Sequence, residues 1–366
     1  MSALRFHWFL PTNGGDGRDI VGGGHGVEVE GASRPHTIDY LGQIARSAEQ
    51  LGFEGALTPT GSWCDDAWIT TAMLAGVTRR LDFLVAFRPG LTSPYLAAQM
   101  AGSFQNLSEG RLLLNVVTGG EAHEQLMYGD DLDKEARYER ADEFLHIVRS
   151  LWSGETVDFE GKHLFVRDAR LEQIPSPIPE LYFGGSSPAA LEVAAKHVDV
   201  YLTWGEPPAA VGEKIARVRE LAAAHGRELR FGVRLHSIAR PRSEAAWAEA
   251  DRLLEGVSDE DIARVQEGLR HSASEGQRRM VDLHGGSRDG LVVHPGLWAG
   301  VGLLRAGAGT ALVGSYTEIA DLIEEYAAVG VSEFVHSGYP HLEEAYWFGE
   351  GVLPELERRG LWKRPA

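Results

Sequence analysis

Residue types that bind anions or exchange protons lie within or just after short apolar runs of strand length. Arg234 and His236 are two positions apart in RFGVRLHSI, so on a strand both side chains point to the same face. Guanidinium groups form forked hydrogen bonds with oxyanions, and histidine exchanges protons near neutral pH. The residues in equivalent places on other runs are Cys64, Arg88, Asn115, Thr118, Trp204, His336, Tyr339 and His341. Together they predict a cationic, aromatic pocket for an anionic or planar ligand.

A second candidate is the stretch Gly184-Gly185-Ser186-Ser187, which ends an apolar run and precedes a predicted helix beginning at Pro188. Backbone N–H groups and hydroxyls at a helix N-terminus bind phosphate well. The simpler alternative is a tight turn in which a serine caps the helix. The pattern alone leaves both open.

Other common sites are excluded by pattern or composition. GGGHG at 22–26 does not open a helix as a dinucleotide fingerprint does, and the chain lacks the P-loop, GxSxG and HExxH motifs, so we expect no metal site. A net charge of −18 argues against nucleic acid and anionic membranes as partners. One cysteine, no signal-peptide pattern and no bilayer-length apolar run predict a cytoplasmic globular protein.

These residues must be positioned by alternating strands and helices. Eight apolar segments read as strands: 6–10, 54–58, 83–87, 112–117, 181–183, 200–203, 231–238 and 333–336. Between them, apolar residues recur at helical spacing, as in Ile319, Leu322, Ile323 and Tyr326, with Thr317 as a possible N-cap. Eight strands separated by helices favour a (β/α)8 TIM barrel over an open sheet.

We expect residues 1–366 to form one barrel domain with three insertions, at about 13–33, 119–180 and 255–310. The second contains an extended stretch, TVDFEGKHLFVRDARL, which predicts a hairpin. The third is long and Gly-rich between strands seven and eight, which predicts a mobile lid at about 285–310.

The strings LTPTGSWCDDAW, YFGGSS, YLTWGEPP, RFGVRLH, LWAGVGLLRAGAGTALVG and SGYPHLEEAY closely resemble the two-component alkanesulfonate monooxygenases. That family belongs to the bacterial-luciferase-like group of flavin monooxygenases, and the resemblance spans essentially the whole chain. It implies reduced FMN as cofactor and O2 as co-substrate, with FMN supplied by a separate NAD(P)H-dependent reductase. The implied reaction converts an alkanesulfonate into an aldehyde and sulfite, and the implied assembly is a homo-oligomer, a dimer or tetramer.

The resemblance also implies roles for individual residues. The implied catalytic set is Cys64, Arg234, His236, Arg305, Tyr339 and His341, and all of these except Cys64, together with Trp204, would bind the substrate. The implied FMN contacts are Asn115, Tyr138, Gly185, Ser186 and Ser187. The 13–33 loop looks longer than in that family and the C-terminal tail shorter.

Three alternatives remain. A sibling enzyme could act on another organosulfur compound such as a sulfone, which would need less positive charge in the pocket. A deazaflavin-dependent oxidoreductase would transfer hydride and consume no O2. A catalytically silent flavin-binding barrel would hold oxidised flavin without turnover.

Overall fold

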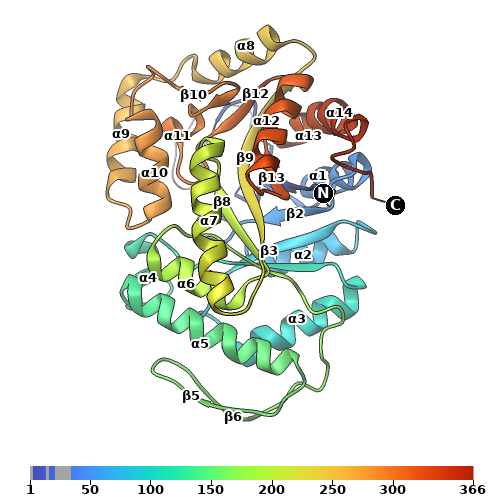
Figure 1. Ribbon diagram of the computed structural model, residues 1–366, viewed down its shortest axis with the longest axis vertical. Helices are drawn as coiled ribbons and strands as arrows, with labels where there is room; N and C mark the ends of the chain where they lie inside the picture. The colour runs from blue at the N-terminus through green and yellow to red at the C-terminus, as the bar shows by residue number, and fades with distance from the viewer. Residues whose placement is uncertain (1–2, 14–15, 21–33, 366) are drawn as a thin grey trace.

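The computed structural model describes residues 3–13, 16–20 and 34–365 (Figure 1). Eight parallel strands close into a ring, because β8 pairs with β9 and β13 pairs with β1. In ring order they are β1 (Arg5–Phe9), β2 (Gly55–Thr58), β3 (Asp82–Phe87), β4 (Leu112–Val116), β7 (Leu181–Phe183), β8 (Val200–Trp204), β9 (Arg230–Arg240) and β13 (Glu333–Ser337). Each overlaps a predicted strand, and the predicted (β/α)8 barrel is confirmed.

Helices surround this ring (Figure 1). Those following successive strands are α1 (Ile38–Leu51), α2 (Ala67–Ala75), α3 (Pro94–Ser108), α4 (Ala122–Met127), α5 (Lys134–Trp152), α6 (Pro188–His197), α7 (Pro208–Ala224), α12 (Tyr316–Ala328), α13 (His341–Trp347) and α14 (Leu353–Arg358). A single π-helical turn, Phe348–Val352, joins α13 to α14. The N-cap of α12 is Ser315, which forms a reciprocal capping box with Glu318, so the predicted cap Thr317 lies inside the first turn instead.

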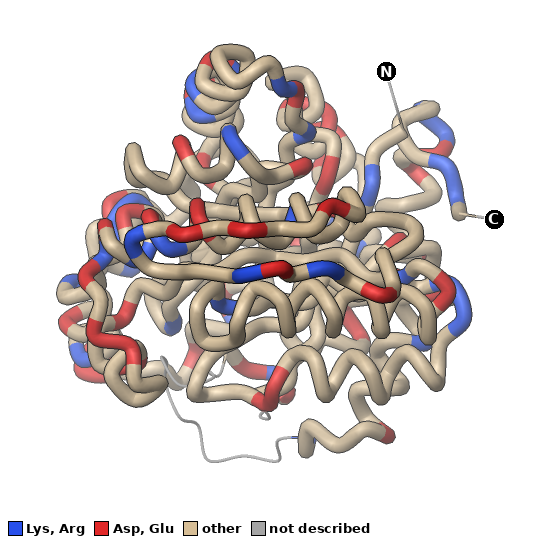
Figure 2. Tube along the Cα trace, turned by 90° about the horizontal axis from the view of Figure 1, so that it is seen from below, with Lys and Arg blue, Asp and Glu red and all other residues tan. Residues whose placement is uncertain are grey.

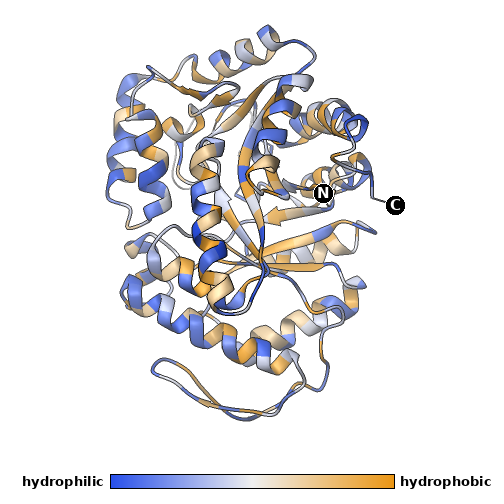
Figure 3. Ribbon diagram, viewed as in Figure 1, coloured by the Kyte–Doolittle hydropathy of each residue, from blue (hydrophilic) through white to orange (hydrophobic). Residues whose placement is uncertain are grey.

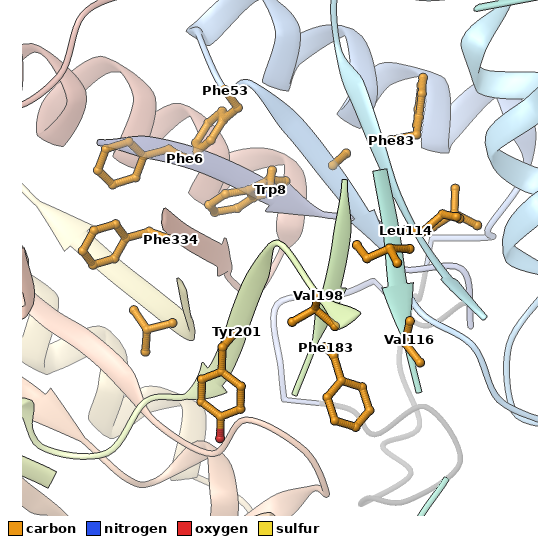
Figure 4. Close-up of a cluster of buried hydrophobic side chains, with 14 of the residues drawn as sticks. Phe6, Trp8, Phe53, Phe83, Leu114, Val116, Phe183, Val198, Tyr201 and Phe334 are labelled. Carbon is orange, nitrogen blue, oxygen red and sulfur yellow. The ribbon is translucent and has the colours of Figure 1, made fainter. Parts of the chain in front are cut away.

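Two apolar layers hold the barrel together. The larger lies between strands and helices, where Phe6, Trp8, Phe83, Phe183 and Phe334 are buried (Figure 4). The smaller fills the barrel interior and consists of Phe9, Leu57, Leu84, Leu113, Tyr182, Val200, Leu202 and Val335. In Figure 3 the helices carry hydrophilic outer faces over hydrophobic strands. No helix in the described part of the chain combines the length and apolar character needed to cross a bilayer.

A buried charge network closes the amino-terminal end of the barrel. Glu333, at the start of β13, accepts hydrogen bonds from Tyr182 Oη (2.6 Å) and His7 Nε2 (3.2 Å). Arg230 lies 3.1 Å from the same carboxylate and Arg5 lies 3.6 Å away. Burial alone would raise the pKa of Glu333, but these partners lower it to about 2.

The predicted hairpin lies at β5 (Val157–Glu160) and β6 (Phe165–Ala169), paired antiparallel. Figure 2 shows it crossing the front of the molecule, with acidic residues along β5 and both acidic and basic residues along β6. Of the predicted 13–33 insertion, residues 14–15 and 21–33 lie outside the described part of the chain.

The insertion between the seventh and eighth barrel strands, β9 and β13, is attached to the second half of β9. The first half of β9, Arg230–Arg234, pairs with β8, whereas His236–Arg240 pairs on with β12 (Ala311–Ser315). A side sheet continues from β12 through β11 (Leu297–Trp298) to β10 (Val292–His294). The remaining elements are α8 (Ser243–Leu254), α9 (Asp259–Arg270), α10 (Glu275–His284) and α11 (Val301–Leu304). Along this edge, therefore, the pairing partner of β9 changes from the barrel strand β8 to the side-sheet strand β12, and β12 pairing begins at His236. We call this change of partner the fork in β9.

Candidate functional site

A cavity of about 350 Å³ opens at the carboxyl ends of the barrel strands. Its wall combines barrel residues such as Phe9, Leu57 and Asn115 with residues 272–280 and 305–308 of the insertion. Among the described residues, five cationic side chains line it against three carboxylates: Lys134, Lys214, Arg234, Arg279 and Arg305 against Glu121, Glu206 and Glu275. The cavity is therefore locally cationic on a protein whose net charge is −18.

Arg234 lies in the cavity wall as a cation that no described carboxylate pairs with. Its side chain is buried, donates to Ser337 Oγ at 2.9 Å and to the Leu235 carbonyl, and places the guanidinium carbon 4.8 Å from the centre of the Phe9 ring. Within the described ranges, no carboxylate oxygen lies within 4.0 Å of it. Burial and the nearby Arg305 lower the pKa of Arg234 to about 9. A buried cation without a counter-ion, facing a cavity, indicates an anion site.

His236 is neutral, and both of its ring nitrogens are hydrogen-bonded. Nε2 lies 3.0 Å from the Ala308 carbonyl, which can only accept, so Nε2 carries the proton. Nδ1 then accepts from the hydroxyl of Ser337 at 2.7 Å. Burial and the neighbouring Arg234 hold the pKa of His236 well below its usual range. His236 is therefore not the proton carrier near neutral pH that its residue type suggests.

Arg305 reaches the cavity from the loop after α11. It donates to Tyr339 Oη and to the Ala306 carbonyl, and Tyr339 stacks on His236 with ring centres 5.5 Å apart. The loop is closed at its base, where Gly302 N donates to the Gly309 carbonyl at 2.9 Å. A Cβ on Gly309 would lie only 2.9 Å from Gly302 Cα, which explains the glycine there. Trp298 and residues 301–304 are buried, so much of the predicted 285–310 lid is packed core, and its mobility stays a prediction.

The opposite wall contains the Gly184–Ser187 turn together with Asn115 and Tyr138. Ser187 caps α6, accepting from Ala190 N at 3.3 Å, which confirms the capping interpretation; it also lines the cavity, and phosphate binding there stays a prediction. A Cβ on Gly184 would lie 2.3 Å from the Leu202 carbonyl oxygen, so the chain can pass there only as glycine. The resulting cradle of backbone and hydroxyl groups at a helix N-terminus fits a phosphate.

Four charged residues near this wall were missed by sequence reasoning. Glu206 accepts from Lys214 Nζ at 2.6 Å and from Arg279 Nε at 2.5 Å. Glu206 lies in the quoted string YLTWGEPP, but Lys214 and Arg279 lie on helices, where a charge usually faces solvent. Lys134 also lines the cavity and donates to the Ala273 carbonyl at 2.8 Å.

Of the predicted site residues, Cys64, Tyr339 and His341 do not line the cavity. The Cys64 thiol donates to the Gly61 carbonyl at 3.5 Å, and burial, with nearby Glu124 and Asp65, raises its pKa to about 11. It is therefore a thiol rather than a thiolate at neutral pH.

His341 lies behind Phe9, with ring centres 5.5 Å apart, and its Nδ1 is 2.8 Å from Asp16 Oδ1. Arg88 is paired with Glu124 at 2.5 Å, outside the cavity wall. His336 lies outside the barrel, stacked on Phe334 with ring centres 5.9 Å apart.

The sequence profile described as luciferase-like monooxygenase matches residues 4–333. The chain belongs to the luciferase-like monooxygenase family. This confirms, at the level of the family, the expectation of a monooxygenase of the flavin-dependent group on a TIM barrel.

Three solved structures resemble this luciferase-like monooxygenase over nearly its whole length. Riboflavin lyase shares 21% identity, covering 99% of this chain and 93% of that chain, with a TM-score of 0.81. Long-chain alkane monooxygenase shares 19%, covering 100% and 93%, with a TM-score of 0.80. EDTA monooxygenase from Chelativorans sp. BNC1 shares 18%, covering 99% and 96%, with a TM-score of 0.76. At these identities the likeness establishes the fold, and the substrate must be argued from the site.

Proposed function

We propose that this enzyme uses reduced FMN and O2 to convert an alkanesulfonate into an aldehyde and sulfite. The observation that carries the proposal is Arg234, a buried guanidinium that faces the cavity with no carboxylate within 4.0 Å in the described part of the chain. Arg305, on the same cavity wall, likewise forms no ion pair with a described residue. A sulfonate is a permanent anion with three acceptor oxygens, which two guanidinium groups complement.

The opposite wall fits the phosphate end of FMN. The Gly184–Ser187 turn offers backbone N–H groups and two hydroxyls, and a Cβ on Gly185 would lie 2.6 Å from Ala190 Cβ, which keeps the helix start close. Asn115 and Tyr138 lie on the same wall. Bound reduced FMN would supply the activation of O2.

The chain's own residues then bind, orient and shield. Arg234 is held in place by Ser337 and binds the sulfonate, while Tyr339 orients Arg305 toward the same end of the cavity. Phe9, Leu57 and other apolar side chains on the wall exclude water and accommodate an alkyl chain. A neutral sulfone would leave both arginines without a counter-ion, which makes the sibling reaction the weaker alternative.

We further propose that FMN is a diffusible cofactor of this enzyme, bound for each turnover and then released. A separate NAD(P)H-dependent reductase would supply reduced FMN in the cytoplasm, and the enzyme would bind reduced FMN more tightly than oxidised FMN. We also propose a homo-oligomer, a dimer or tetramer.

The test is sulfite release in the presence of a general NAD(P)H:FMN reductase, over sulfonates from methane- to decanesulfonate, with dimethyl sulfone and an alkane as comparison substrates. Catalase and a reaction without this enzyme correct for peroxide from free flavin. We expect sulfite from sulfonates only, with oxygen uptake in proportion, and tighter binding of reduced than of oxidised FMN in anaerobic and aerobic titrations.

Each other outcome identifies a different protein. Turnover of the sulfone but not of sulfonates would identify the sibling enzyme. Substrate oxidation without oxygen uptake would indicate hydride transfer to a deazaflavin. Protein that purifies with oxidised flavin and turns over nothing would be a flavin-binding barrel.

A further inference from the structure

Ser337, the last residue of β13, is fully buried and lies between the two cavity residues of the neighbouring strand. Its Oγ is 2.9 Å from Arg234 Nη2 and 2.7 Å from His236 Nδ1. Ser337 is the first residue of the string SGYPHLEEAY, but the sequence assigned it no role, because a serine beside a histidine on a strand is an ordinary core residue.

The direction of each hydrogen bond around Ser337 follows from its neighbours. The Arg234 guanidinium can only donate, so Ser337 Oγ accepts from it. The His236 Nε2 proton is committed to the Ala308 carbonyl, so Nδ1 is an acceptor and the Ser337 hydroxyl proton points to it. The hydrogen bonds therefore run from Arg234 to Ser337, from Ser337 to His236, and from His236 to the Ala308 carbonyl, with the hydroxyl of Ser337 and the ring N–H of His236 each donating once.

The last acceptor in this series of hydrogen bonds, the Ala308 carbonyl, lies in the loop that carries Arg305. Ala308 is three residues beyond Arg305, and Tyr339, which accepts from Arg305, stacks on the His236 ring. His236 is thus joined to both arginines, to Arg234 through a hydroxyl and to Arg305 through the loop and Tyr339. The groups that face His236 from the surrounding elements are Arg234, Arg305, Tyr339 and His341.

We propose that Ser337 is a positioning residue that fixes the Arg234 guanidinium and, through neutral His236, its spacing from Arg305, so that both arginines bind one anion. This rests on the proposed function in naming that anion a sulfonate. In this arrangement His236 serves as a fixed connector, and the charge of the anion is matched by the arginines alone.

The protein supplies a matched control on the other side of the same two strands. Ser237 on β9 is also buried and lies 2.7 Å from a histidine Nδ1, that of His336 on β13. That pair lies outside the barrel, against Phe6 and Phe348. Ser237→Ala therefore removes a serine–histidine hydrogen bond of the same length without touching the cavity.

The experiment compares Ser337→Ala, Ser337→Thr and Ser237→Ala in the full chain. Three properties are measured: kcat and KM for sulfite release, reduced-FMN affinity, and histidine ring ¹⁵N spectra, with His236→Gln used to assign the His236 signals. We expect similar losses in Tm for both alanine variants. Only Ser337→Ala should raise KM, by about tenfold to a hundredfold, as for a lost hydrogen bond to a charged group. It should also move the His236 Nδ1 resonance, and Ser337→Thr should recover part of both effects.

Equal KM values in Ser337→Ala and Ser237→Ala would overturn the proposal, as would a wild-type spectrum in which His236 Nδ1 carries the proton. Loss of reduced-FMN affinity in Ser337→Ala would also overturn it, because Ser337 would then act on the cofactor end. A wild-type protein that releases no sulfite from any sulfonate refutes the proposed function instead, and the ¹⁵N spectra still decide the hydrogen-bond chain.

Discussion

Replacing Arg234 by Met removes the guanidinium and keeps much of the apolar stem. The pKa of about 9, against an ordinary 12.5, means that burial and the nearby Arg305 disfavour the charged form by roughly 5 kcal/mol, at about 1.4 kcal/mol per pH unit. A bound anion offsets that cost. Losing one partner of a buried charged pair costs about 2 to 5 kcal/mol, so we expect kcat/KM for a sulfonate to fall by roughly thirtyfold to several thousandfold.

The assay measures sulfite release, reduced-FMN affinity and the Tm of the ligand-free protein on the same preparations. Arg234→Lys keeps the charge but loses the fork, so it should recover only part of the rate. Reduced-FMN affinity should stay nearly unchanged, since we propose that the phosphate binds at Ser186 and Ser187. Ligand-free Arg234→Met should melt no lower than wild type, because the change removes a buried cation that has no carboxylate partner among the described residues. Poor flavin binding with normal turnover of the complex that does form would place Arg234 at the cofactor and refute the sulfonate site.

Three further predictions concern other parts of the fold. Arg305→Ala should fold normally, lose about tenfold to a hundredfold in kcat/KM as a cation at the cavity edge, and be cut faster by protease at 285–310 with ligands present; unchanged sulfite release would remove it from the site. Cys64→Ala should keep turnover within about fivefold, and wild-type alkylation should accelerate only toward pH 11, where the thiol ionises; fast alkylation at pH 7 would contradict this. Glu333 has a folded pKa of about 2 against 4.5 unfolded, so urea titrations should show the free energy of unfolding falling as the pH drops from about 4.5 toward 2. Glu333→Gln should lower the free energy of unfolding by about 3 to 5 kcal/mol and should remove this pH dependence. An unaltered pH dependence in Glu333→Gln would mean that other carboxylates cause it.

The barrel was predictable because its strands are apolar on both faces and are separated by helices of clear periodicity. The segment DFLVAF at 82–87 can only be a strand covered on both sides, and β3 spans it. The alternation of side chains along a strand placed Arg234 and His236 on one face of β9, and Arg234 pairs with Trp204 at the carboxyl end of β8, the end of the barrel where sites form.

The insertion could not be predicted to the same depth, because its packing depends on contacts distant in sequence. Its glycines suggested an irregular, mobile loop, yet Gly302 and Gly309 bring two backbones together, and Trp298 is buried. For the same reason Arg279 resembled a solvated helix charge until the fold placed it against Glu206. Periodicity identifies the face of a helix that is buried, but not the cavity that its polar face borders.

The fork in β9 has a consequence for how such a protein can change. The segment between Arg240 and Ala311 begins at the end of β9 and ends at β12, which pairs with the second half of β9, His236–Arg240. None of the strand pairs of the eight-stranded ring includes this segment, so the ring keeps its hydrogen bonds if the segment is exchanged. Yet the same segment supplies residues 272–280 and 305–308 of the cavity wall. A graft at this single attachment would replace residues 272–280 and 305–308 while leaving Arg234 and the Gly184–Ser187 turn in place, so one part of the cavity wall can change in sequence while the barrel and the rest of the wall stay the same.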